Sequence, residues 1–422
     1  MQKPTEISKG NANVKDFGEV NHILENIDWD FSLRTPAHGK LRPFDCRKHH
    51  WFPATFIPEI PFTMIEVLTH PKASVYDPFS GIGTTYFQAL SLNRRPLATE
   101  ICEVAVQFMK SLLILFDPML ELESLKDTLM KIAKEFEPHK HYTERIRHDR
   151  SIKILMDRLQ PWYHERTFNQ LSYLFIEEHY CDNTPAKAAM RILISAILRR
   201  ACSQDRGWGC IADNMLPKPN QIIYKDVISL FKKDLKYLIS RLQEHLGNIK
   251  EGYDQLYSEV AKNETIFHTD VRNNEHVSSD SVDLIVTSPS YPNMTDYVKS
   301  QRLSYYWLGI PISSANNDLI SEIGARRKRQ SKDALKKYLE DMQICIKILS
   351  SKVREGGFVC FVMPLFGRND LKRKRIIHKV MSELERLFVK EKEFERIIPA
   401  VRRAHNIKWA TLEREKIFVF RK

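Results

Sequence analysis

The stretch VDLIVTSPSYPN, residues Val282–Asn293, decides the fold. It begins as an apolar, β-branched run and stops abruptly at small residues, prolines and an aromatic ring. This pattern predicts a buried parallel strand that ends in a rigid loop, Thr287–Asn293, called here the Ser288 loop. Ligands of open α/β sheets bind outside the carboxyl ends of such strands. The loop suits amine chemistry, because a hydroxyl and a proline-flanked carbonyl accept hydrogen bonds from an NH2 group and an aromatic ring stacks on a base.

A second loop of chemical interest lies upstream. Residues 73–76 read as a short strand, and Asp77–Thr85, DPFSGIGTT, separate it from a predicted helix. The order strand, glycine turn, helix brings backbone N–H groups and a helix N-terminus close to a ligand. Gly81 and Gly83 permit that approach because they lack a Cβ atom. We call Asp77–Thr85 the Gly81 loop and predict that it binds a ligand.

Together the two loops resemble those of the amino-methylating DNA methyltransferases, which modify the exocyclic nitrogen of cytosine or adenine. Residues 288–291, Ser-Pro-Ser-Tyr, resemble the family's SPPY catalytic motif, with Ser290 where the family usually has a second proline. We expect that change to loosen the loop. The Gly81 loop resembles the S-adenosylmethionine loop of the same family. Residues 47–61, dense in aromatics and prolines, resemble the segment that walls the methionine end of the cofactor in relatives.

The resemblance implies roles for named residues. Ser288 and the Pro289 carbonyl would draw the target amine towards tetrahedral geometry, and Tyr291 would stack on a base flipped out of the duplex. Glu100 ends a predicted strand at the interval where Rossmann-type folds place a carboxylate on ribose hydroxyls, and Asp270 is placed to accept from the adenine amino group. The implied S-adenosylmethionine-binding set is Asp77, Phe79, Gly81, Gly83, Thr84, Thr85, Glu100 and Asp270.

A serine at the head of the motif favours cytosine N4 as the target. Methylation of adenine N6, methylation of an RNA amine and a catalytically silent DNA-binding protein stay open as alternatives. The favoured reading is the modification enzyme of a restriction-modification system. The sequence shows no nuclease signature, so a partner restriction endonuclease would be a separate chain.

The charge of the chain favours a polyanionic partner. Its 422 residues carry a formal net charge of +12, which points first to nucleic acid and second to an anionic membrane surface. A basic surface without a specific partner is the remaining reading. Cations interleaved with aromatics suit a surface that tracks a phosphate backbone. Our candidate contacts to double-stranded DNA are Asn293, Arg302, Arg326, Arg327, Lys328 and Arg329.

Cysteine usage and hydropathy bear on location. The seven cysteines form no C-x-x-C pair, which is typical of a reducing cytosol. Cys46 lies near His49 and His50, but no second pair accompanies them, so we predict no metal site. The sequence contains neither a signal peptide nor an apolar run long enough to span a bilayer. We therefore expect a soluble protein in the cytoplasm of a bacterial or archaeal cell, without membrane contact.

Seven strand candidates lie at Ser74, Leu97, Ile266, Leu284, Val359, Ile397 and Val419. The resemblance implies an α/β fold, a Rossmann-like methyltransferase sheet of seven strands whose last strand is antiparallel. Between the second and third strands, apolar residues step by three and four, which predicts a large helical insertion. We divide the chain into a polar N-terminal arm (1–40), a catalytic domain (41–116 and 263–422) and the insertion (117–262), which is a candidate target-recognition region.

Overall fold

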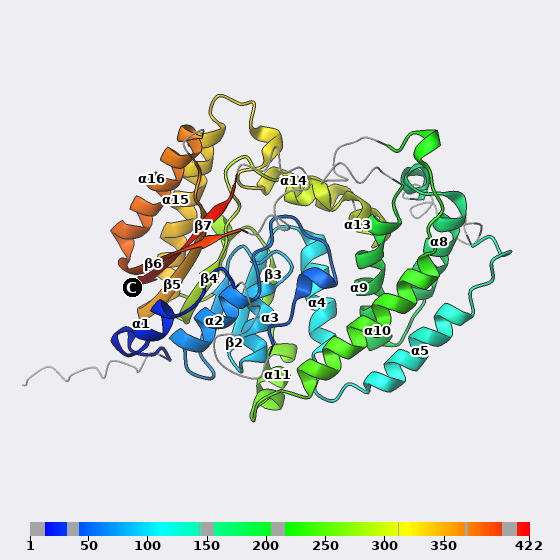
Figure 1. Ribbon diagram of the computed structural model, residues 1–422, viewed down its shortest axis with the longest axis horizontal. Helices are drawn as coiled ribbons and strands as arrows, with labels where there is room; N and C mark the ends of the chain where they lie inside the picture. The colour runs from blue at the N-terminus through cyan, green and yellow to red at the C-terminus, as the bar shows by residue number, and fades with distance from the viewer. Residues whose placement is uncertain are drawn as a thin grey trace, which may run out of the picture.

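The fold is mixed α/β and is built on one seven-stranded sheet (Figure 1). The computed structural model describes residues 13–31, 42–142, 144, 156–203, 216–310, 312–367, 370–398 and 412–422. The strand order across the sheet is β3-β2-β1-β4-β5-β7-β6. The strands are β1 (Ser74–Asp77), β2 (Arg95–Glu100), β3 (Ile266–His268), β4 (Val282–Thr287), β5 (Val353–Pro364), β6 (Val389–Ile397) and β7 (Arg414–Arg421).

Five strands run parallel and the end of the chain turns back on them. β3, β2, β1, β4 and β5 pair in parallel, and β7 pairs antiparallel with both β5 and β6. The predicted mostly parallel sheet with an antiparallel final strand is confirmed. β7 is inserted between β5 and β6, so the final hairpin contributes one internal strand and one edge strand. Every residue of β4 is buried, as its continuous apolar run predicts for a central parallel strand.

Helices cover both faces of the sheet, because alternate strand residues point to opposite sides. Leu284 and Val286 of β4 pack with α1 (Phe17–Glu25) and α2 (Glu59–Leu68). Ile285, between them, packs with α15 (Ala334–Lys352) and α16 (Leu371–Leu387) on the other face. Both faces are therefore closed, and the edge where the parallel strands end is the place left for a ligand.

Residues 13–31 fall in the stretch that we expected to be a polar arm, but they are packed against the sheet. Phe17, Val20 and Leu24 recur every three or four residues and form the buried side of α1. The Asp16 side chain caps the helix by accepting from the Gly18 N–H at 2.7 Å. Trp29 stacks on Phe394 of β6, with ring centroids 4.8 Å apart. The rest of the expected arm lies outside the described residues.

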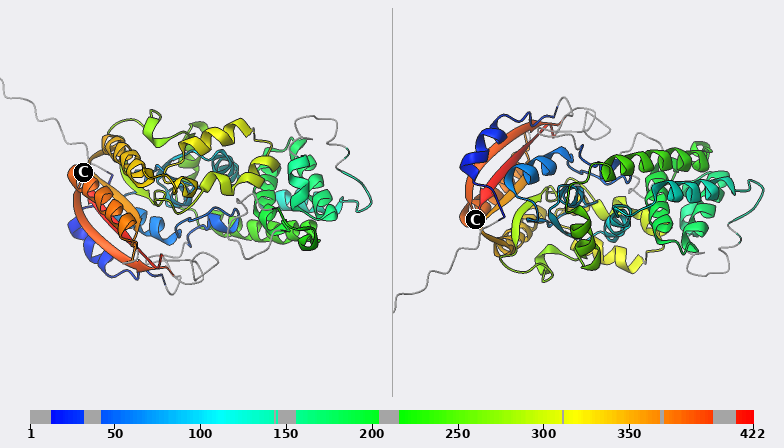
Figure 2. Two further views of the ribbon diagram at one scale, coloured as in Figure 1. Left: turned by 90° about the horizontal axis from the view of Figure 1, so that it is seen from above. Right: turned by 90° about the horizontal axis from the view of Figure 1, so that it is seen from below.

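The segment between β2 and β3 is helical, as its periodicity predicts, and extends away from the sheet (Figures 1 and 2). α4, α9 and α10 belong to one continuous apolar core. The helices between β2 and β3 are α4 (Glu103–Leu115), α5 (Leu122–Lys134), α8 (Glu165–His179), α9 (Thr184–Ala201), α10 (Val227–Leu246) and α11 (Tyr253–Lys262). The same core also includes residues of α3 (Thr84–Ser91), which precedes β2. In the described part of the chain, no helix is long and apolar enough to cross a membrane.

Three short helices follow the Ser288 loop and run from the sheet towards the helical insertion (Figure 1). Tyr305 on the second of them donates to Asp318 on the third, and Asp318 accepts from the N–H of Glu103 at the start of α4 at 3.1 Å. The segment is thereby fixed to the carboxyl edge of the sheet. The three helices are α12 (Tyr297–Ser300), α13 (Arg302–Trp307) and α14 (Ile312–Ser321).

Candidate functional site

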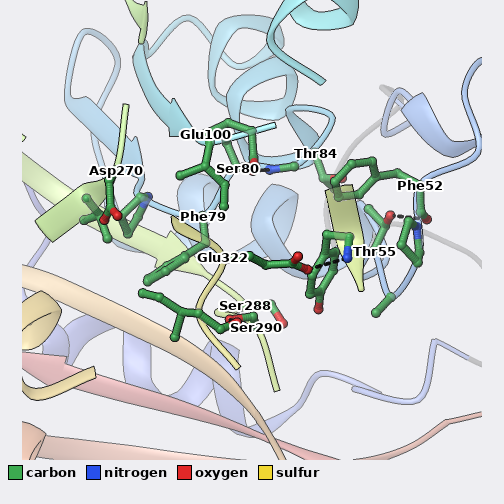
Figure 3. Close-up of a pocket in the computed structure, with 18 of the residues that line it drawn as sticks. Phe52, Thr55, Phe79, Ser80, Thr84, Glu100, Asp270, Ser288, Ser290 and Glu322 are labelled. Atoms are coloured by element: carbon green, nitrogen blue, oxygen red, sulfur yellow. Dashed lines mark hydrogen bonds between the residues drawn. The ribbon is translucent and has the colours of Figure 1, made fainter. Parts of the chain in front are cut away.

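One pocket collects residues from segments that are far apart in the sequence (Figure 3). It encloses about 760 Å³ of empty space, part of it open to solvent. Because β1, β2, β3 and β4 are parallel, the segments that follow them meet at one edge of the sheet. The pocket is lined by residues 52–56, 78–81, Thr84, Glu100, Ile101, 269–271, Ser288, Ser290, Tyr297 and 321–323.

The Gly81 loop forms one wall of the pocket. Gly83 has φ of 82°, a conformation that L side chains rarely adopt, and it directly precedes α3. A Cβ atom there would lie 2.9 Å from the Met109 side chain, and one on Gly81 would lie 3.3 Å from the Phe52 ring. The glycines therefore allow the loop to pack closely between α4 and the 52–56 segment, with Thr84 at the first turn of α3.

Two buried oxygen atoms in the Gly81 loop have no hydrogen-bond partner: Asp77 Oδ2 and Thr84 Oγ1. The other Asp77 oxygen accepts from the Phe79 N–H at 3.1 Å and from the Thr287 hydroxyl at 2.7 Å. Burial raises the pKa of Asp77 to about 6. Buried polar atoms are rarely left without a partner. Thr84 lines the pocket, so a ligand that brings an N–H donor fits its oxygen, whereas Asp77, Gly83 and Thr85 are not among the lining residues.

Glu100 is held at the end of β2 by backbone donors. Its carboxylate accepts from the Gly81 N–H at 2.7 Å and from the Cys102 N–H at 2.9 Å. Burial raises the pKa of Glu100 to about 7, and the nearby Asp77 acts in the same direction. The side chain lines the pocket and points into it from the strand end (Figure 3). Its remaining lone pairs can accept from ligand hydroxyls.

Asp270 follows β3 and lies on the same wall of the pocket. Its carboxylate accepts from Arg272 Nε at 3.0 Å, and Arg272 also pairs with Asp341 at 2.8 Å. The hydrogen bonds that Arg272 donates to Asp270, together with the charges of Asp270 and Asp341, raise the pKa of Arg272 above its ordinary range. Asp270 is therefore fixed by the strand end and the arginine, at a position where the residue lines the cavity.

The Ser288 loop lies opposite the Gly81 loop and is bonded to it. Thr287 donates to Asp77, and Thr85 Oγ1 donates to the Val286 carbonyl at 3.1 Å. Ser288 and Ser290 line the pocket, whereas Pro289 and Tyr291 are not among its lining residues. The Tyr291 ring is buried, and its hydroxyl donates to Glu415 Oε1 of β7 at 3.0 Å.

Ser290 is hydrogen-bonded through both its side chain and its backbone carbonyl. Its hydroxyl donates to the Ile323 carbonyl at 2.9 Å, and its own carbonyl accepts from the Tyr338 hydroxyl at 3.0 Å. A proline at this position would have no side-chain donor for the first of these bonds. We expected Ser290 to loosen the loop; in the structure, this residue makes two hydrogen bonds to neighbouring elements.

Glu322 and Tyr297 line the pocket but were not predicted as site residues, whereas Phe52 belongs to the segment 47–61 that the resemblance places beside the cofactor. Glu322 is buried in the wall, where it accepts from the Tyr297 N–H at 2.5 Å and from Arg327. Burial raises the pKa of Glu322, and Arg327 opposes the rise. The rings of Phe52 and Tyr297 stack with centroids 5.8 Å apart. The aromatic density around Phe52 was a usable signal, but nothing in the sequence marks Glu322.

The predicted nucleic-acid contacts are divided between surface and interior. Arg326, Lys328 and Arg329 are exposed beside the pocket rim. Arg327 is half-buried and pairs with Glu322 and, at 3.3 Å, with Asp296. Asn293 is buried, has φ of 57° and donates its backbone N–H to the Gly324 carbonyl at 2.9 Å, and Arg302 on α13 is half-buried.

A second basic run comes close to the first in the folded chain. Residues 372–375, at the start of α16, read Lys-Arg-Lys-Arg, and Lys372 and Arg375 are exposed. Arg373 lies 2.8 Å from Met294 Sδ, while the Arg326 N–H donates to the Thr295 carbonyl at 3.1 Å. The two runs therefore flank residues 293–296, which directly follow the Ser288 loop.

The cluster of Cys46, His49 and His50 is part of the core. All three residues are buried, His49 stacks on Phe44, and His50 is hydrogen-bonded to Ser195 of α9. Burial lowers the pKa of both histidines to about 4. Within the described ranges, no group of three or more His, Cys, Asp or Glu side chains is arranged to hold a metal ion.

Comparison with known protein families gives a match over the first part of the chain. The N6/N4 methyltransferase family model, described as DNA methylase, matches residues 2–111. This range contains the 52–56 segment, the Gly81 loop and Glu100, and it ends before the helical insertion and the Ser288 loop. No curated protein matches the chain. The family match supports a DNA amino-methyltransferase and leaves the target nitrogen undecided.

Proposed function

We propose that this protein transfers a methyl group from S-adenosylmethionine to an exocyclic amine in duplex DNA, with cytosine N4 as the favoured target. The observation that carries the proposal is the shared pocket, whose walls include both the Gly81 loop and Ser288. A donor molecule and an acceptor base bound there would lie side by side. Their placement would convert a bimolecular transfer into a step within one complex.

The residues of the pocket fit the proposed cofactor, which supplies an electrophilic methyl group on a sulfonium. Glu100 would accept from the ribose hydroxyls and Asp270 from the adenine amino group. The unpartnered oxygens of Asp77 and Thr84 would accept from the amino-acid end. Phe79, Gly81, Gly83 and Thr85 complete the proposed cofactor-binding set.

The chain's own groups address the difficulty of the reaction, which is the delocalisation of the amine lone pair into the ring. Ser288 Oγ and the Pro289 carbonyl would accept the two N–H groups and draw the nitrogen towards tetrahedral geometry. Oriented dipoles of this kind lower barriers by several kcal/mol, on the order of 3 kcal/mol for a single group. No charged nucleophile is needed: the N–C bond would form as the S–C bond of the donor breaks, and the surplus amine proton would pass to solvent, to which the pocket is partly open.

A base inside a duplex must leave the stack before it can enter the pocket. Tyr291 is the proposed stacking residue from the resemblance, and Tyr297 is a second candidate because its ring lines the pocket beside Phe52. Stacking on an aromatic side chain contributes about 1–3 kcal/mol per base. Separate alanine substitutions of the two tyrosines, assayed on duplex and single-stranded substrates, distinguish them.

The two basic runs are the proposed contact to the DNA backbone. Arg326, Lys328, Arg329, Lys372 and Arg375 are exposed beside the segment that follows the Ser288 loop. Lysine and arginine contacts to phosphates supply affinity and register without reading sequence. The bases of the target sequence would then be recognised by another part of the chain, and the helical insertion is the candidate.

One experiment tests the function. The purified protein is incubated with labelled S-adenosylmethionine and bacterial DNA, and the nucleosides are identified by mass. N4-methylcytosine is the expected product, whereas N6-methyladenine would keep the mechanism and change the base. RNA added as a competing substrate tests the RNA alternative, and binding to DNA without methyl incorporation would favour a silent protein. Pairing with a separate restriction endonuclease is tested by protection of methylated DNA from that enzyme.

A further inference from the structure

Tyr291 links the Ser288 loop to a buried ion pair on the last two strands. Ser288 Oγ donates to the Tyr291 hydroxyl at 3.4 Å, a long hydrogen bond, and Tyr291 donates to Glu415 Oε1 at 3.0 Å. The other Glu415 oxygen accepts from Arg396 Nη1 at 2.7 Å. Glu415 on β7 and Arg396 on β6 are direct cross-strand partners, so the backbone ladder holds the two charges together.

The chain of groups is shielded from solvent. Tyr291, Glu415 and Arg396 are 7%, 9% and 3% exposed, respectively. Arg396 also donates from Nε to the Trp29 carbonyl at 3.2 Å. A guanidinium keeps its charge in proteins, and a buried carboxylate paired with it has only acceptor atoms. Burial, together with the Glu415 charge, raises the pKa of Tyr291 well above its ordinary value, so the phenol keeps its proton.

These facts give the hydrogen bonds a single direction. Glu415 can only accept, so the Tyr291 proton points to Glu415, and the Tyr291 oxygen is then free to accept from Ser288. The Ser288 proton is thereby directed away from the pocket that Ser288 lines. We propose that Glu415 is a positioning residue that, through Tyr291, presents the Ser288 oxygen to the target amine as an acceptor only. This inference rests on the proposed methyl-transfer function.

Replacement of Glu415 by glutamine reverses that direction. Arg396 is a pure donor, so it selects the amide oxygen, and the amide NH2 group then faces Tyr291. The phenol must accept from the amide and donate to Ser288. The serine proton would turn towards the pocket and oppose the N–H groups of the target. An isosteric change two groups away from the pocket should therefore impair the chemical step.

The test compares purified full-length variants E415Q, Y291F and the double variant with the wild type in methyl transfer to duplex DNA. E395Q is the matched control, because Glu395 lies one residue before Arg396 on the same strand pair and is exposed. We expect E415Q to lower kcat at least about tenfold, the effect of one hydrogen bond to a charged group. The affinity for S-adenosylmethionine and the KM for DNA should stay within about twofold, since Glu415 touches neither.

Non-additivity is the second readout. If Glu415 acts through Tyr291, the double variant should be no slower than the slower single variant. Wild-type kcat in E415Q, a loss confined to KM or cofactor affinity, or additive losses would each overturn the inference. Should E415Q fail to fold, Y291F leaves the ion pair intact and decides the question, because wild-type kcat in Y291F also overturns it. A wild-type protein that incorporates no methyl group would instead refute the proposed function.

Discussion

The Ser290 hydroxyl donates to the Ile323 carbonyl at 2.9 Å, so the Ser288 loop is bonded to the segment 321–323, which forms another wall of the pocket. Ile323 immediately follows Glu322, whose carboxylate accepts from the Tyr297 N–H. The two walls therefore hold each other in place around the cavity. The residue that departs from the expected proline contributes directly to this connection.

Removal of that hydroxyl should weaken the connection without changing the fold. S290A is expected to lower the free energy of unfolding by about 1 kcal/mol, the typical net contribution of one hydrogen bond, and kcat by a few-fold. Urea unfolding and methyl-transfer assays measure the two effects. The control is S351A, because Ser351 is exposed at the end of α15. Equal stability of S290A and S351A would contradict the proposed role of the bond.

Ser288 is expected to act in the transition state and not in cofactor binding. S288A should lower kcat by about 10²–10³-fold, the range for one oriented donor or acceptor in an active site. Y291A should abolish measurable transfer, because it removes both the ring and the hydrogen bond to Ser288. Calorimetry should find the affinity of both variants for S-adenosylmethionine within about twofold of the wild type. Normal transfer by both variants would refute the proposed mechanism.

The pH dependence of cofactor binding should follow Glu100. Its pKa of about 7 lies above the ordinary value of 4.5 because of burial. If the ionised carboxylate accepts from the ribose, affinity should rise about tenfold from pH 6 to pH 8, as the ionised fraction does for such a group. E100Q should flatten this profile, apart from a smaller slope from Asp77, which titrates in the same direction. If the affinity of E100Q for the cofactor changed with pH as steeply as that of the wild type, a group other than Glu100 would be responsible for the pH dependence.

The raised pKa of Glu100 should make the folded protein less stable as the pH rises, although it makes cofactor binding stronger. A carboxyl group whose pKa is higher in the folded than in the unfolded state binds more protons when folded. Its contribution is therefore present below pH 4.5 and is lost as the pH rises through about 7. Chemical unfolding at pH 5 and pH 8 should show a smaller loss of stability with pH in E100Q than in the wild type.

The exposed cations beside the Ser288 loop should contribute to DNA affinity independently of sequence. Neutralisation of Arg326 and Arg329, or of Lys372 and Arg375, should weaken binding to all duplexes alike. Each neutralised cation that contacts a phosphate should lower the slope of the logarithm of the DNA-binding constant against the logarithm of the salt concentration by about 1. The matched control neutralises Lys131 and Lys134 on α5, far along the helical insertion. An effect of the α5 variant alone would move the backbone-binding surface to the insertion.

Local sequence patterns were sufficient to predict the framework. The seven strand candidates all fall within observed strands, and the apolar periodicities of residues 122–136 and 227–246 match α5 and α10. Such patterns report which face of an element is buried, which is a property of neighbouring residues in the chain. The Gly81 loop could also be predicted, because two glycines between a strand pattern and a helix pattern indicate a turn, and both glycines have positive φ values in the structure.

Contacts between distant segments could not be predicted in this way. α1 looked polar because only three of its nine residues, Phe17, Val20 and Leu24, are buried against the sheet. The partners Tyr291 and Glu415 are brought together only because β7 inserts between β5 and β6, a choice of strand order that no local pattern encodes. Arg327 looked like its exposed neighbours until Glu322 and Asp296 were placed beside it.

The order of strands and helices along the chain, the two loops that carry the chemistry and the resemblance of those loops to a known family could all be predicted from the residue pattern. Which residues share the pocket with the two loops depends on the packing of the whole chain. That packing placed Glu322 and Tyr297 in the wall, turned Tyr291 towards Glu415, and brought residues 326–329 and 372–375 to either side of one segment. The physical reason is that burial and periodicity are local properties, whereas the pairing of side chains across a sheet depends on how all the elements pack at once.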